Sequence, residues 1–156
     1  MAVGSSLTLE NPPNKKYKGE SSHALINGMG GTINYQDKSW QGFEAEDLIA
    51  IIDLGSAKTI NEIEVRFLQS QVFWIFLPYH IQIEHSSDGK NFELIYEDFP
   101  SNNFSFEQKI ISYKANLGPL ETRFIRVKGY NIDQCPDYHP GAGGPSWIFS
   151  DEIIIN

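Results

Sequence analysis

The sequence predicts an all-β domain in which many short strands form an antiparallel sandwich or barrel. Apolar residues alternate with polar ones in several segments, and turn residues such as Asp and Gly separate these segments. No segment keeps the 3.6-residue period of an amphipathic helix over three turns. With 156 residues, the chain suits one domain whose core is large enough to fold without a disulfide or a metal.

The first expected strand follows a polar lead-in. We expect residues 1–16, which carry a Pro-Pro pair, to be a linker or lead-in, and residues 17–156 to form the domain. The run 49–55 is rich in Ile and ends in a turn at a glycine, which is typical of a strand. In the segment 62–67, Ile, Val and Phe alternate with Glu and Arg, which predicts a half-buried strand.

A hairpin is expected next. Apolar and polar residues alternate over 81–84, and a turn with the sequence Ser-Asp-Gly-Lys follows at 87–90. Because Asp-Gly favours the positive φ angles of tight hairpin turns, the segment 92–96 is the expected partner strand. Further strands are expected over 108–113, 123–128 and 147–155.

The charge of the chain excludes two classes of partner. Twelve basic and twenty acidic residues give a net charge of −8, whereas nucleic acids and anionic membranes require clustered Lys and Arg. We therefore expect no nucleic acid and no membrane as partner, and a neutral ligand fits better. The longest apolar run, 72–77, ends at Pro78 and is too short to span a bilayer.

The N-terminal residues carry no signal-peptide pattern, since neither a cationic start nor a long apolar stretch follows Met1. We expect the sequence to be a segment of a longer protein. Cys135 is the single cysteine, which excludes an intrachain disulfide but does not identify a compartment.

Catalysis would need paired carboxylates in a cleft, a nucleophile beside a base, or an open metal site. Glu44, Glu46 and Asp47 cluster in a turn before a strand, where an acidic surface patch is the expected role. Cys135 precedes His139 by four residues, but no third group is placed to orient the histidine. We therefore expect a binding domain rather than an enzyme.

Four segments share an order and a spacing that are more specific than any segment alone. They are 24–28 (ALING), 40–43 (WQGF), 52–55 with 60–63 (IDLG, INEI), and 124–127 leading to 151–153 (FIRV, DEI). Together they resemble the discoidin-like family, also called the coagulation factor 5/8 type C domain, which in bacterial enzymes appears as a galactose-binding-like, family 32-type carbohydrate-binding module. The resemblance implies an antiparallel jelly-roll β-sandwich of about eight strands, with the function in loops at one end.

The segment 135–147 (CPDYHPGAGGPSW) is similar to a narrower group, the C-terminal accessory domains of bacterial β-hexosaminidase-type glycoside hydrolases. This similarity implies a secreted, periplasmic or cell-surface parent protein. Its partners would be the terminal sugar of a glycan and the catalytic domain of the parent chain. The rival interpretation is a structural or protein-interaction domain that supports the catalytic domain and binds no sugar.

The resemblance also implies a structural Ca²⁺ site between the first loop and the last strand, built from roughly six to eight oxygens. Asn27 stands where the family usually has Asp, so the site would carry one negative charge fewer and bind calcium more weakly. A site that is empty, or filled by sodium or water, is the alternative. The implied ligands are the carbonyls of Ala24, Met29 and Asp151, the side chains of Asn27 and Thr32, and the carboxylate of Glu152.

The implied sugar site combines aromatic rings that stack on a sugar with polar groups for its hydroxyls. For two of the rings a second interpretation is open. Trp40 can pack beneath a loop, and Trp74 can belong to the core. Galactose binders of the family carry a His after the first Trp and an Arg in the second loop, but Gln41 takes the first position and the second loop has no Arg. The similarity to hexosaminidase accessory domains implies an N-acetylhexosamine as the first ligand, and the missing Arg puts galactose second. The implied sugar-binding residues are Trp40, Gln41, Gln71, Trp74, Asp137, Tyr138 and His139.

Overall fold

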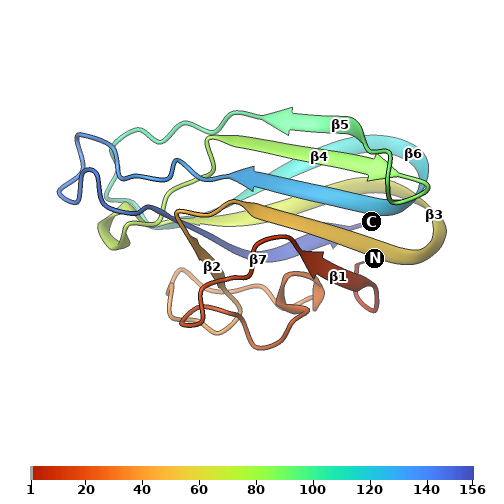
Figure 1. The fold of residues 1–156 in the computed structure, drawn as a ribbon, viewed down its shortest axis with the longest axis horizontal. Coiled ribbons are helices and arrows are strands. Elements are labelled where there is room, and N and C mark those ends of the chain that lie inside the picture. The colour runs from red at the N-terminus through yellow and green to blue at the C-terminus, as the bar shows by residue number, and fades with distance from the viewer. Residues whose placement is uncertain (1) are drawn as a thin grey trace.

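The computed structural model, which describes residues 2–156, is a single antiparallel sheet that folds over itself into a two-layered β-sandwich (Figure 1). The predicted fold class is therefore confirmed. Helix is limited to two short 3-10 turns, η1 (Ala24–Ile26) and η2 (Gln71–Phe73). The strands are β1 (Ser6–Leu9), β2 (Gln41–Glu44), β3 (Leu48–Gln69), β4 (His80–Ser86), β5 (Glu93–Asp98), β6 (Lys109–Tyr130) and β7 (Trp147–Ile155).

Two long strands, β3 and β6, pass through both layers and hold them together. They pair with each other along most of their length, and the register shifts between Asp53 and Lys58 and again between Ile60 and Glu62. At these shifts both strands bend, as Figure 1 shows at the end that carries the two chain termini. The first half of β3 pairs with β1, and its second half pairs with β7. The order across the sheet is β2-β7-β3-β6-β4-β5.

The core fills the space between the two layers. Along β3, the side chains at alternate positions are buried, as the period of two predicts. Ile52 and Ile63 lie in the same apolar cluster as Ile81 of β4 and Ile153 of β7, so both layers contribute to one core. Burying each of these aliphatic side chains stabilises the fold by about 1.5–3 kcal/mol.

The expected lead-in over residues 1–16 is wrong in part, because it contains strand β1. Ser6–Leu9 pairs with residues 50–53 of β3 and extends the sheet. The loops that follow, from residue 10 to residue 40, cross the outer surface of β7 and β2 (Figure 1). They cover a second, smaller apolar cluster formed by Trp40, Leu68, Ile75 and Phe149.

Three loops gather at the end of the sandwich opposite the termini, on the left of Figure 1. They span residues 70–79, 99–108 and 131–146, which lie between β3 and β4, β5 and β6, and β6 and β7. Over residues 2–156, no helix is long and apolar enough to cross a membrane. The loop end is where the candidate binding residues of the second half of the chain meet.

Candidate binding site

Trp74 is held in a strained backbone conformation at the loop end. Its φ of 65° and ψ of 19° lie in the left-handed region, which bulky residues rarely adopt. The N–H of Trp74 donates to the carbonyl of Gln71 (2.9 Å), and Ser70 and Ile75 exchange two backbone hydrogen bonds across the turn. Such strain costs on the order of 1 kcal/mol, and the turn that imposes it directs the indole ring toward the neighbouring loops.

The glycine-rich segment between β6 and β7 forms a seat for the indole ring of Trp74. A β-carbon placed at Gly141 would lie 2.5 Å from Trp74 Cζ2, and one at Gly144 would lie 2.6 Å from Cζ3. The His139 ring meets the indole edge-on, with 5.9 Å between ring centroids. The indole therefore has one covered side, and 36% of the residue remains exposed to solvent.

Gln71 and His139 are largely buried, and their hydrogen bonds join the loops. The N–H of Gly141 donates to Nδ1 of His139 (3.0 Å), so the ring proton lies on Nε2, which donates to the carbonyl of Gln71 (2.7 Å). The Gln71 side chain donates to the carbonyl of Asn103 (2.8 Å) and accepts the N–H of Ser105 (3.2 Å). These bonds fix all three loops relative to one another.

The three loops enclose a cavity of about 140 Å³ beside Trp74, which we call the Trp74 cleft. Phe104 and Phe106 pack edge-to-face at 4.6 Å between ring centroids, and Phe106 is 72% exposed. The Tyr138 ring contacts Phe104 (5.7 Å) and its hydroxyl donates to the carbonyl of Asn102. The residues that line the cleft are Gln71, Val72, Trp74, Phe104, Ser105, Phe106, His139 and Pro140.

Sequence reasoning missed Phe104 and Phe106. The signal is a pair of large aromatic residues, two positions apart, in a segment without a strand partner. A loop with no regular structure seldom retains exposed rings by chance, because large aromatic residues are favoured in cores and at interfaces. Of the predicted residues, the structure brings Gln71, Trp74, Tyr138 and His139 together at this end, and exposed Asp137 lies next to them in the chain.

The prediction that Trp40 and Gln41 belong to the same site is wrong. Trp40 is 1% exposed and packs in the second apolar cluster, and its indole N–H donates to the carbonyl of Thr32 (2.9 Å). Gln41 is also 1% exposed, and its amide donates to the carbonyl of Lys18 (3.0 Å). Both residues anchor the loops that cross the outer surface of the sheet.

The two chain segments expected to hold calcium do meet. A β-bulge in β7 sets Asp151 and Glu152 opposite the single residue Arg66 of β3. The N–H of Gly31 donates to Asp151 Oδ2 (2.6 Å), and the N–H of Gly28 lies 3.1 Å from both carboxylate oxygens of Glu152. The first loop and the last strand are thus connected by backbone-to-carboxylate hydrogen bonds.

The donor set fits an oxygen-preferring cation in both charge and chemistry. Arg66 Nη2 lies 3.0 Å from Asp151 Oδ2 and balances that charge, whereas buried Glu152 has no basic side chain as partner among residues 2–156. Burial raises the pKa of the Glu152 carboxyl, because removal from water disfavours the charged form.

The side-chain oxygens of the other two expected calcium ligands, Asn27 and Thr32, already accept one hydrogen bond each. Asn27 Oδ1 accepts the N–H of Met29 (2.8 Å), and the Thr32 hydroxyl accepts the N–H of Asn34 (3.3 Å). Each of these oxygens keeps a second lone pair for a cation. The described residues contain no cluster of three His, Cys, Asp or Glu, so such a site depends on backbone and amide oxygens.

Cys135 and His139 do not form a nucleophile–base pair. Both ring nitrogens of His139 are used by Gln71 and Gly141, and the Cys135 thiol faces the carbonyl of Pro145 (3.9 Å). Burial raises the pKa of the Cys135 thiol, which disfavours the reactive thiolate.

Comparison with known proteins extends these observations. A sequence model of the F5/8 type C domain matches residues 6–144. No curated protein matches the chain. Among solved structures, chitosan-binding module 1 of a chitosanase/glucanase from Paenibacillus sp. IK-5 is 13% identical, with a TM-score of 0.65 over 99% of this chain and 96% of that chain.

Two further similar structures hold sugars. The module CpGH89CBM32-4 of Clostridium perfringens, in complex with GlcNAc-α-1,4-galactose, is 15% identical, with a TM-score of 0.61 over 99% of this chain and 92% of that chain. The CBM32 of AlyQ, in complex with 4,5-unsaturated mannuronic acid, is 16% identical, with a TM-score of 0.56 over 97% of this chain and 93% of that chain.

Proposed function

Because the chain belongs to the F5/8 type C domain family, whose members bind ligands rather than transform them, we propose that it is a non-catalytic carbohydrate-binding module with its sugar site in the Trp74 cleft. The similar structures from Paenibacillus and Clostridium perfringens support this, since both are carbohydrate-binding modules by name. The ligand is a terminal sugar, because the cleft is small, at about 140 Å³.

The observation that carries the proposal is the position of Trp74, whose backbone is strained and whose side chain is partly exposed. The fold holds an indole ring in a left-handed backbone conformation, on two glycines, with 36% of the residue exposed. A ring that served only the core would be covered and unstrained. A fixed flat platform loses little conformational freedom when a sugar stacks on it, so binding loses less entropy.

The lining of the cleft favours an N-acetylated hexosamine over galactose. Val72, Phe104, Phe106 and Pro140 make most of it apolar, and Ser105 is the lining residue with a hydroxyl. The methyl group of an acetamide can occupy such apolar surface, whereas an additional sugar hydroxyl gains nothing there. We propose millimolar to high-micromolar affinity, because exchange of water for one or two protein hydrogen bonds yields little net free energy.

We also propose that the first loop and the last strand bind one structural Ca²⁺. Uncompensated Glu152 would supply the charge, with oxygens of Ala24, Asn27, Met29, Thr32 and Asp151 completing the set. Calcium would link residues of the two chain ends and add no catalytic function. Support comes from the burial of Glu152 without a basic partner among residues 2–156.

The parent protein is proposed to be a secreted or cell-surface glycoside hydrolase, whose catalytic domain this module holds near its glycan. The Paenibacillus module, which derives from a chitosanase/glucanase, supports this arrangement. A second candidate function is a contact surface for the catalytic domain itself, and the 72% exposure of Phe106 favours it.

A glycan array probed with the isolated domain, in calcium and in chelator, tests the proposed function. We expect signals on glycans that end in N-acetylhexosamine, and loss of these signals in the Trp74→Ala variant. Binding to no glycan in either condition would overturn the sugar-binding proposal and favour the contact-surface alternative.

A further inference from the structure

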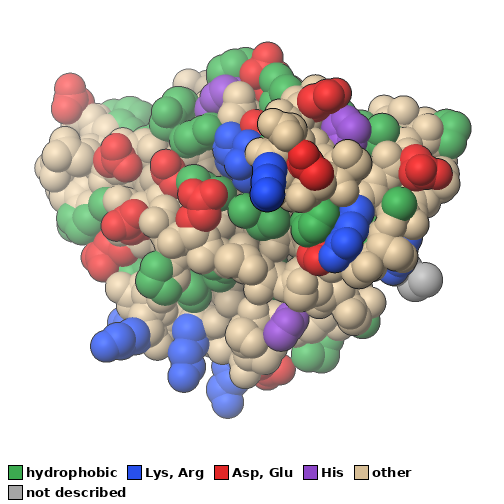
Figure 2. Space-filling view, turned by 45° about the vertical axis from the view of Figure 1, so that its right-hand side comes forward, with side chains coloured by type: hydrophobic (Ala, Val, Ile, Leu, Met, Phe, Trp, Pro, Cys, Tyr) green, Lys and Arg blue, Asp and Glu red, His purple; other side chains and the backbone are tan. Residues whose placement is uncertain are grey.

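The basic side chains of this acidic protein fall into two groups. Among residues 2–156, the three Arg and three of the Lys, Lys109, Lys114 and Lys128, form ion pairs with Asp or Glu. Six lysines form none, and four of these six surround one surface hollow. These four are Lys15, Lys16, Lys18 and Lys38. In Figure 2, basic side chains project together from the lower edge of the molecule, where the N-terminal loops lie, while most acidic side chains lie above them.

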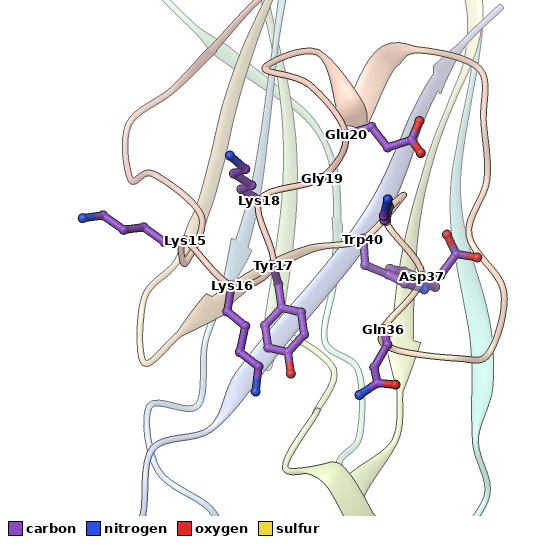
Figure 3. Close-up of a pocket in the computed structure, with 10 residues that line it drawn as sticks. Lys15, Lys16, Tyr17, Lys18, Gly19, Glu20, Gln36, Asp37 and Trp40 are labelled. Atoms are coloured by element: carbon purple, nitrogen blue, oxygen red, sulfur yellow. The ribbon is translucent and has the colours of Figure 1, made fainter.

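The hollow is larger than the Trp74 cleft and borders a second one. Its volume is about 720 Å³, and the adjoining hollow of about 520 Å³ shares Lys15, Lys18, Gly19 and Glu20 with it. We call the combined feature the lysine groove. Figure 3 shows Lys15, Lys16 and Lys18 extending from one loop segment, with the Tyr17 ring beside Lys16 and Trp40 on the side of Asp37. Lys16 Nζ lies 5.2 Å from the centroid of the Tyr17 ring. Because these side chains are on the surface, the groove is open to a ligand of several residues.

Two acidic residues also line the groove, but they leave it positive. Asp37 accepts the N–H of Ser39 (3.0 Å) and of Thr32 (3.2 Å), and the bond from Ser39 holds the pKa of this carboxyl below its usual range. Figure 3 shows Asp37 and Glu20 on the side away from Lys15 and Lys16. Four ammonium groups against two carboxylates give a local excess of positive charge in a chain whose net charge is −8.

A buried amide at the floor of the groove offers an unused acceptor. Gln41 lines the adjoining hollow and is 1% exposed, and its Oε1 has no hydrogen-bond partner among the described residues. A buried acceptor without a partner costs about 1–3 kcal/mol, so a hydroxyl donor from a ligand would relieve a defect. The amide nitrogen of Gln41 already donates to the carbonyl of Lys18, which connects this acceptor to the lysine segment.

We propose that the lysine groove is a second saccharide site, selective for acidic oligosaccharides whose carboxylate or sulfate groups pair with Lys15 and Lys18. Ammonium groups provide the charge, and Tyr17 and Gln41 provide a ring and an acceptor for the hydroxyl-bearing faces of the chain. A nucleic acid is disfavoured, because the charge of the whole protein repels a long phosphodiester chain beyond this short groove. The proposal stands apart from the Trp74 cleft, since the two sites share no residue.

Isothermal titration with tetragalacturonate tests the proposal, with its methyl ester as the neutral control and a sulfated galactan oligosaccharide as the second anion. We expect that the uronate or the sulfated ligand binds and that the ester does not. Raising the salt from about 0.05 M to about 0.5 M should weaken binding, because exposed charges are screened. The stronger of the two anionic ligands identifies which anion the groove prefers.

Matched variants test whether the anionic ligand binds in the lysine groove or elsewhere on the protein. Replacing Lys15 and Lys18 with Gln should weaken binding about tenfold, while the same change at the other unpaired lysines, Lys58 and Lys90, should have little effect. Trp74→Ala should leave uronate binding intact, so loss of neutral-sugar binding and loss of acidic-sugar binding are distinguishable. Equal binding of the ester, equal effects of both lysine pairs, or no binding of either anion would overturn the proposal.

Discussion

The indole ring of Trp74 lies so close to Gly141 that a β-carbon at this glycine would fall 2.5 Å from the ring. Gly141 therefore determines where the indole can sit, although it adds no side chain to the cleft. Gly144 constrains the same six-membered ring of the indole, because a β-carbon there would lie 2.6 Å from Cζ3. The orientation of the binding platform depends on a segment more than sixty residues away in the chain.

Replacing Gly141 with Ala should displace Trp74 and reduce sugar affinity. The backbone at Gly141 does not have positive φ, so Ala fits the main chain and the conflict is with the ring alone. We expect overpacking to lower the free energy of unfolding by about 1–3 kcal/mol. Titration with N-acetylglucosamine and thermal unfolding measure the two effects.

Gly143→Ala is the matched control. Gly143 has a φ of 78°, and no atom lies within 4 Å of the position that a β-carbon would take, so Ala there strains the backbone without touching Trp74. The free energy of unfolding of this variant should fall by an amount similar to that for Gly141→Ala, and its affinity for sugar should be unchanged. If both variants lost affinity equally, the seat for Trp74 would not explain binding.

Calcium should raise the melting temperature of the domain. An ion that binds the folded state alone stabilises it by mass action, and about 1 kcal/mol corresponds to about 3 °C for a domain of this size. Glu152→Gln should abolish the rise, and Asn27→Asp should enlarge it by adding a negative charge. Magnesium at the same concentration should act more weakly, because it needs a tighter octahedral site. An equal response of wild type and Glu152→Gln to calcium would contradict this ligand set.

Glu84 should make the domain sensitive to acid. Its carboxylate accepts hydrogen bonds from Arg126 and from Lys128 (3.0 Å), and its side chain is 12% exposed. Burial acts to raise the pKa of Glu84, but the bonds from Arg126 and Lys128 outweigh it and lower the pKa. Since the folded pKa is depressed, this stabilisation is present above the unfolded pKa of about 4.3 and is lost as pH falls through the folded value.

The Glu84→Gln variant should therefore unfold more easily at pH 7, by about 1.5–3 kcal/mol, and lose less stability on acidification than wild type. Asp53→Asn is the control, because Asp53 is paired with Arg123 in a more exposed place, with 26% of its side chain accessible. Denaturant unfolding between about pH 7 and pH 3 measures both. Parallel pH profiles for wild type and Glu84→Gln would count against this assignment.

The strands can be predicted from the sequence because a period of two is a local signal. The alternation at Ile63, Val65 and Phe67 matches the buried face of β3. The same signal exists in β1, where Leu7 and Leu9 alternate with polar residues, but four residues are too short a run to separate from a polar linker. The bends of β3 and β6 through both layers depend on pairing between distant segments and have no local signature.

The binding loops are only partly predictable, for the same physical reason. Whether Trp40 faces a ligand or the core depends on the loops that fold over β7, and nothing within the WQGF segment encodes that cover. The sequence places Trp74 in the correct loop, whereas the platform around it comes from Phe104, Gly141 and Gly144 in two other loops. Side chains that share a cleft only through tertiary contacts leave no spacing pattern in the chain.

The most direct test of sugar binding in the Trp74 cleft is a titration of wild type and Trp74→Ala with N-acetylglucosamine, accompanied by their melting temperatures. We expect millimolar to high-micromolar binding by wild type and none by Trp74→Ala, with a small change in melting temperature because the ring is partly exposed. Tyr79→Ala, which removes an exposed ring outside the cleft, should bind as wild type does. Unchanged binding by Trp74→Ala, or a loss of about 3–5 kcal/mol of stability as for a core aromatic, would contradict the central claim.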